Sequence, residues 1–141
     1  MTPRSERLQP AADQARQKAG DALAQFAAQQ QALARVEQQL GELERYRREY
    51  AGVGDGAVSV SALLNRQQFV ARIDQAIAQQ MAEVNRHRRR LEQMRDHWKK
   101  AHARESALDS VIAQHQEHER RAEDRHEQAE IDERMQHRRQ R

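Results

Sequence analysis

Apolar residues recur at alternating spacings of three and four along the first third of the chain, the heptad pattern of a coiled-coil helix. With Leu33 taken as an a position, only Gln29 and Arg47 interrupt the apolar a and d positions between residues 8 and 50. The pattern predicts a helix over about residues 11–50 that packs through a continuous seam. Its a positions are Ala12, Ala19, Phe26, Leu33, Leu40 and Arg47, and its d positions are Leu8, Ala15, Ala22, Gln29, Val36, Leu43 and Tyr50.

A second heptad register begins at Leu63 and keeps its apolar character as far as Ile112. It predicts a longer helix over about residues 60–135. His87 occupies a d position, where we interpret it as a residue that sets the register rather than as a pH sensor. The a positions are Leu63, Val70, Ile77, Val84, Leu91, Trp98, Glu105 and Ile112, and the d positions are Ile73, Gln80, His87, Met94, Ala101 and Leu108.

The stretch AGVGDG separates the two registers and contains Gly52, Gly54 and Gly56. Glycine supplies the positive φ angles that reverse a chain, so we expect a turn over about residues 51–58. Two helices joined by so short a turn run antiparallel. The predicted fold class is therefore all-α: residues 1–141 form a single antiparallel coiled-coil hairpin of two long helices, the second longer than the first.

The final part of the second helix, residues 117–141, does not continue the seam. Its d positions include Ala122 and Ala129, but its a positions are Glu119, His126 and Glu133. A helix without a packed face gains little stability in water. We expect this tail to be a mobile or single helix until a partner covers it.

Composition narrows the class of protein. The chain is 37% apolar, 4% aromatic and 33% charged, which leaves too few bulky side chains for the core of a compact enzyme domain. Its 25 basic and 22 acidic residues are interspersed, as on a solvated helix with pairs such as Glu117 with Arg121. Cysteine is absent, and the amino-terminal residues lack an apolar signal core, so we predict a cytoplasmic protein.

Near the predicted turn, apolar side chains spread from the seam onto one flank. Tyr46 and Phe69 fall at g positions, which a two-stranded coil leaves half exposed, and Tyr50 occupies a d position close by. Two interpretations remain open. The aromatic side chains clamp the end of the hairpin, or they form an exposed apolar patch for a partner.

Three segments carry a resemblance to a known family. They are QQLGELERYRREY (Gln38 to Tyr50), LLNRQQFVARIDQAIAQQ (Leu63 to Gln80) and WKKAHARES, which begins at Trp98. With the glycine-containing turn, they resemble the flagellar export protein family FliJ, which is related to the YscO-type stalk proteins of type III secretion.

The resemblance implies a component of the flagellar export apparatus without catalytic activity. It implies that the helix ends bind the hexameric export ATPase and that the hairpin end binds the cytoplasmic domain of the export gate. Export chaperones are further candidate partners. The implied location is the cytoplasm, peripherally on the inner face of the cell membrane at the flagellar base. Gln80 stands where histidine fits the family pattern better. The implied gate-contacting residues are Gln39, Leu43, Tyr46, Tyr50, Phe69, Ile73 and Ala76.

A basic stretch supports a competing hypothesis. Residues Asn85 to Arg104 contain eight Arg or Lys against Glu92 and Asp96, which suits a coiled coil that binds nucleic acid or an anionic membrane surface. The charges are spread around the helix, however, and no groove-reading motif accompanies them. We therefore expect no nucleic-acid partner.

Sites for metals and cofactors are not expected. His115 and His118 lie one turn apart beside Glu119, but no further ligand cluster or enclosing pocket supports a zinc site. The GVGDG stretch lacks the lysine of a phosphate-binding loop. We predict no catalytic residue, no metal and no cofactor.

Overall fold

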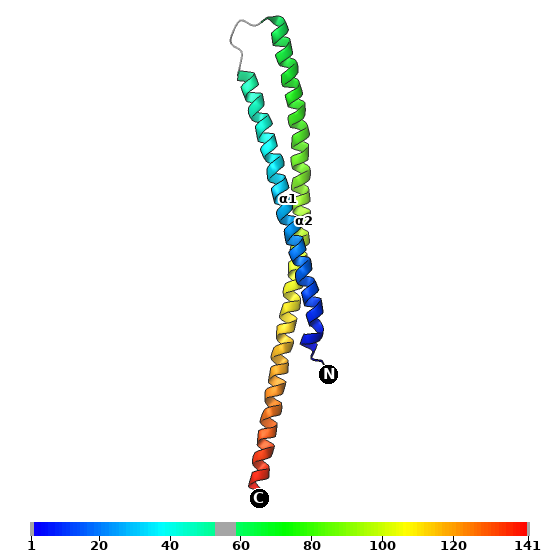
Figure 1. Cartoon of the computed structure of the whole chain (residues 1–141), viewed down its shortest axis with the longest axis vertical. Helices are drawn as coiled ribbons and strands as arrows, with labels where there is room; N and C mark the ends of the chain where they lie inside the picture. Colours follow the sequence, from blue (N-terminus) through cyan, green and yellow to red (C-terminus); the bar gives the residue numbers. More distant parts are fainter. Residues whose placement is uncertain (1, 53–58, 141) are drawn as a thin grey trace. The chain divides into compact units, whose positions relative to one another are not determined.

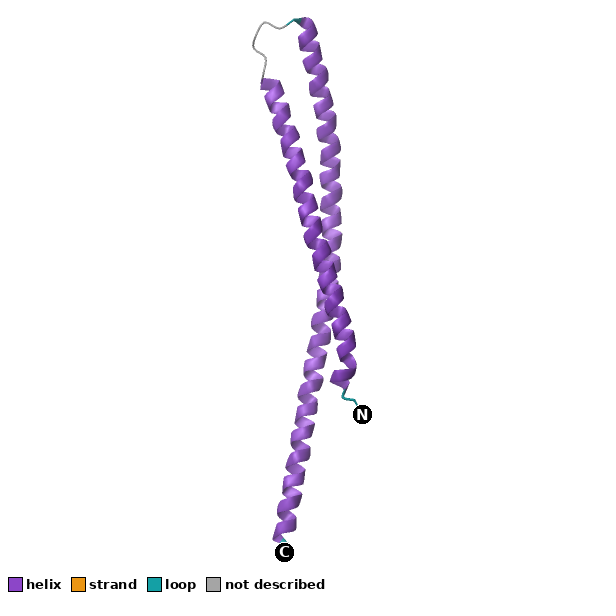
Figure 2. Cartoon of the chain, viewed as in Figure 1, coloured by secondary structure: helices purple, strands orange, loops and turns teal. Residues whose placement is uncertain are grey.

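A computed structural model describes residues 2–52 and 59–140 of the chain. Helix α1 covers Arg4–Gly52 and helix α2 covers Val60–Arg139 (Figures 1 and 2). The two helices pack against each other and α2 is the longer, which confirms the predicted all-α class of two long helices. The predicted turn largely coincides with residues 53–58, which lie outside the described residues.

Helix α1 begins upstream of its predicted start, and Pro10 lies inside it. A proline within a helix removes one backbone hydrogen bond and costs about 3 kcal/mol. The helix nevertheless extends to Arg4 because the heptad seam continues on that side: Ser5, at an a position, is 5% exposed and contacts α2. Helix α2 begins after Ser59, whose Oγ accepts a hydrogen bond from the Ala62 backbone N–H at 3.2 Å, as in an N-cap.

Contacts between the helices fall into two units, residues 1–21 with 98–141 and residues 22–97. We call them the alanine unit and the aromatic unit after their characteristic side chains. The prediction of one domain over the whole chain stays a prediction.

In the aromatic unit, the two helix segments run antiparallel, since Gln29 contacts His87 whereas Arg47 contacts Asp74. The predicted seam is confirmed from Val70 onward, because every a and d position of α2 in this unit is buried or half-buried there. Ile73 and Val84 are the least exposed of its large apolar side chains, at 6% and 3%.

In the alanine unit, α1 contributes Ala12, Ala15 and Ala19, which are 0%, 2% and 4% exposed. Ile112 is the buried apolar residue of the α2 segment. Every described residue from Arg120 to Gln140 is exposed, although the helix continues to Arg139. This agrees with the prediction that the tail forms a single helix.

Candidate partner-binding surface

Tyr46, Tyr50 and Phe69 form one aromatic cluster in the aromatic unit. The ring centroids of Tyr50 and Phe69 are 4.5 Å apart, those of Tyr46 and Tyr50 are 5.3 Å apart, and those of Tyr46 and Phe69 are 6.2 Å apart. All three pairs are tilted, at distances typical of favourable aromatic pairs. Tyr46 remains 45% exposed and Tyr50 36% exposed. The rings therefore hold one another in place and still present apolar area to solvent.

The other expected contact residues lie along the same part of the unit, with different exposure. Gln39 is exposed and its Oε1 accepts a hydrogen bond from Gln80. Leu43 and Ala76 are half-buried. Ile73 is 6% exposed, so in the free chain it supports the cluster from the seam and offers a partner little area.

An ion pair that the heptad pattern does not predict lies next to the cluster. Arg47, a polar residue at an a position of the seam, donates to the carboxylate of Asp74 on α2. This hydrogen bond raises the pKa of Arg47. The pair could be found in the sequence only once the register between the helices was known, because the two residues lie on different helices.

The start of α2 corrects one seam assignment. Leu63 was expected at an a position but is 47% exposed, and its neighbours Val60 and Leu64 are 75% and 53% exposed. The physical reason is the end of α1 at Gly52, because the antiparallel register places the seam partner of Leu63 beyond that residue. Because α1 ends only two residues after Tyr50, this side chain is also exposed although it occupies a d position.

A second polar contact joins the helices in the alanine unit. The Ser5 backbone N–H and Oγ donate to the two carboxylate oxygens of Glu119, at 3.2 and 2.7 Å. The Ser5 N–H belongs to the first turn of α1, where it has no partner within its own helix. These hydrogen bonds lower the pKa of Glu119. Glu117 also has a lowered pKa, but its partners are Arg120 and Arg121 on its own helix, the latter as predicted.

Other candidate chemistry finds little support among the described residues. They contain no group of three or more metal-ligating side chains, so His115, His118 and Glu119 do not form one. In the basic stretch, Arg86 pairs with Glu83 and Arg88 with Glu37, at 3.5 Å for the second pair. Neither described helix has an apolar stretch that could cross a membrane.

Comparison with known families decides the relationship. The family model of the flagellar FliJ protein matches residues 4–141. The chain belongs to the FliJ family. This match confirms the resemblance expected from the sequence. FliJ proteins are components of the flagellar export apparatus. Comparison with curated proteins and with solved structures gives no match.

Proposed function

We propose that this FliJ-family chain is a non-enzymatic stalk that couples the export ATPase to the export gate during flagellum assembly. Membership of the family supports a role in export. The observation that carries the finer assignment is the aromatic cluster, whose Tyr46 and Tyr50 are 45% and 36% exposed. A chain with so few aromatic residues places three of them together at one end of α1 and near the start of α2.

In this proposal, the aromatic cluster with Gln39, Leu43, Ile73 and Ala76 binds the cytoplasmic domain of the gate. Rings that already contact one another lose little conformational freedom on binding, so burying their exposed faces adds affinity at low entropic cost. The Arg47–Asp74 pair at the same site supplies polar groups for the rim of the interface.

The exposed tail and the amino-terminal part of α1 bind the ATPase hexamer in this proposal. The tail from Arg120 onward has no packed face in the described structure, so a partner gains access to all sides of it. Export chaperones are additional candidate partners. The protein then acts in the cytoplasm, peripherally at the inner face of the membrane at the flagellar base.

The test replaces two rings and measures binding to the gate domain. The paired substitution Tyr46→Ala and Phe69→Ala removes two of the three rings, and with them all three ring contacts. It is expected to weaken binding to the gate domain by at least about 30-fold, since interface aromatics are often worth ~2 kcal/mol or more. Gln38→Ala, at an exposed position away from the cluster, is the matched control and should leave binding unchanged. Normal gate binding by a double variant that melts far earlier than the wild type would instead make the cluster a structural clamp.

A truncation tests the other partner. Deleting residues 117–141 should reduce stimulation of ATP hydrolysis by the export ATPase while gate binding persists. Unchanged stimulation would remove the tail from the mechanism. Binding that centres on residues 85–104 and weakens steeply with salt would favour the competing model of a nucleic-acid or membrane-surface binder.

A further inference from the structure

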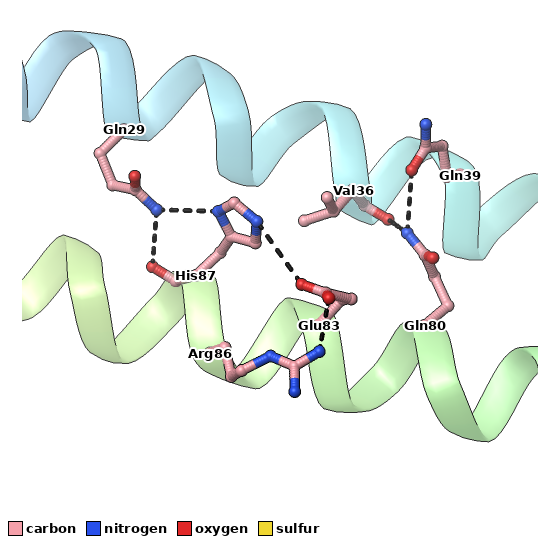
Figure 3. Close-up of polar contacts among 7 residues, drawn as sticks. All are labelled: Gln29, Val36, Gln39, Gln80, Glu83, Arg86 and His87. Carbon is pink, nitrogen blue, oxygen red and sulfur yellow. Dashed lines mark hydrogen bonds and ion pairs between the residues drawn. The ribbon is translucent and has the colours of Figure 1, made fainter.

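Two polar layers built on glutamine side chains interrupt the apolar seam of the aromatic unit (Figure 3). In the first, Gln29 is 6% exposed and its Nε2 lies 2.9 Å from His87 Nδ1 and 3.1 Å from the His87 backbone carbonyl oxygen. One amide group of α1 therefore engages both the side chain and the backbone of a single residue on α2.

The second layer repeats this arrangement in the opposite direction. Gln80 of α2 donates from Nε2 to the Val36 carbonyl oxygen and to Gln39 Oε1, both at 3.0 Å. The two layers lie one heptad apart on each helix, since seven residues separate Gln29 from Val36 and Gln80 from His87. Each helix thus contributes one amide that binds a backbone carbonyl of the other.

The hydrogen bonds of the first layer also determine which atoms of Gln29 donate and which atoms of His87 accept. A backbone carbonyl can only accept a hydrogen bond, so the nitrogen of the Gln29 amide must face His87. Its second N–H then points to His87 Nδ1, which must accept. The ring proton is placed on Nε2, which lies 3.8 Å from Glu83 Oε2, and Glu83 is also bound by Arg86 (Figure 3). An apolar side chain in place of His87 provides no such acceptor.

Apolar contacts alone distinguish registers poorly in this unit. Because the a and d positions repeat every seven residues, a slip of one heptad again places most apolar side chains against apolar ones. The same slip moves Gln29 opposite Met94 in one direction and opposite Gln80 in the other. Both slips take the buried amide away from His87 Nδ1, and the slip to Met94 leaves it opposite a side chain without a strong acceptor, which costs free energy.

We propose that Gln29, His87 and Gln80 are positioning residues that fix the register of the aromatic unit. By fixing the register, they bring Tyr46 and Tyr50 of α1 into contact with Phe69 of α2. A one-heptad slip displaces the helices by ~10 Å and takes these rings out of contact. The consequence for gate binding rests on the proposed function, whereas the register itself does not.

The chain contains no cysteine, so spin labels attach only to two cysteines introduced by substitution. Labels at Ala24→Cys and Gln68→Cys occupy exposed positions outside the seam, and their separation reports the register in the full-length protein. Pulsed electron paramagnetic resonance should give one distance for the otherwise unaltered chain. Adding Gln29→Leu, His87→Leu and Gln80→Leu should retain the helical content but produce a second population shifted by several ångströms to ~10 Å.

Leu40→Ala is the matched control, because it weakens the seam at a half-buried a position without touching either polar layer. It should lower the melting temperature and keep one distance. If the triple variant does not fold, Gln80→Leu alone removes one layer and should give a smaller second population. A single unshifted distance in the folded leucine variants would overturn the proposal. A shifted population with undiminished gate binding would uphold the positioning role and contradict the proposed gate surface.

Discussion

The alanine unit and the aromatic unit use the same heptad repeat, but α1 contributes mostly small side chains to the seam of the first unit and mostly larger ones to the seam of the second. In the alanine unit, Ala12 and Ala15 are 0% and 2% exposed, whereas the aromatic unit leaves rings such as Tyr46 45% exposed. Complete burial of a methyl group removes little apolar area from water, and partial burial of a large side chain can remove more. Periodicity thus predicts where helices touch, but side-chain volume decides how much the contact stabilises and how much surface remains for partners.

The largest expected effect on stability lies in the aromatic unit. Ile73→Ala should destabilise the hairpin by about 2 kcal/mol, at the low end of the range for buried isoleucine because a two-helix seam collapses readily around a cavity. Thermal and urea unfolding followed by circular dichroism measure the change. Met81→Ala, at a side chain that is 50% exposed, should cost less than about 0.5 kcal/mol. Equal losses would show that the seam does not carry the stability of this unit.

The alanine unit should instead be sensitive to added volume. Ala15→Leu is expected to destabilise by about 1 kcal/mol or more, because a side chain that is 2% exposed has no room for three further carbons without moving the helices. Ala24→Leu, at an exposed position of the same helix, is the control in the same unfolding experiment. A stabilising effect of Ala15→Leu would mean that this seam is loosely packed and that the contrast with the aromatic unit is wrong.

Acid should weaken the contact between Ser5 and Glu119 in the alanine unit. The pKa of Glu119 is lowered in the folded chain, chiefly by the Ser5 hydroxyl hydrogen bond, so its contribution is present above the unfolded value of about 4.3 and is lost as the pH falls through the lower folded value. Glu119→Gln removes the charge at neutral pH and should speed amide exchange at residues 4–8 on the order of fivefold, as for a weakened helix cap.

Glu117 provides the matched control for that experiment, because its pKa is also lowered but its partners lie on its own helix. Glu117→Gln should leave exchange at residues 4–8 unchanged. The same response to both substitutions would show that Glu119 acts through general charge and does not cap α1.

The smallest effect is expected for the exposed ion pairs. Arg16 lies 3.8 Å from Glu105 and 3.7 Å from Asp109, and its side chain is 59% exposed. Arg16→Gln should change stability by ~0.2–1 kcal/mol, and less at high salt. Unfolding at low and high ionic strength checks this, and a larger loss that persists in high salt would indicate that packing of the arginine stem matters more than its charge.

The fold was predictable because helix periodicity and the glycine stretch are local signals. The a and d assignments hold from Val70 to Ile112, and the aromatic flank at Tyr46 and Phe69 was also visible in the repeat. Contacts that depend on the alignment between helices, such as Arg47 with Asp74 and Ser5 with Glu119, were not predicted. The seam assignment of Leu63 failed because heptad counting on one helix does not reveal where its partner ends.

Hydrogen exchange of the whole chain, free and with each partner, tests the central claim most directly. The account predicts that the gate domain slows exchange in residues 39–50 and 66–77 and that the ATPase slows it in residues 117–140. Gate-dependent protection should disappear in the Tyr46→Ala and Phe69→Ala variant while ATPase-dependent protection remains. Gate-dependent protection confined to residues 85–104, or unchanged in the aromatic variant, would contradict the assignment of the aromatic cluster as the gate-binding surface.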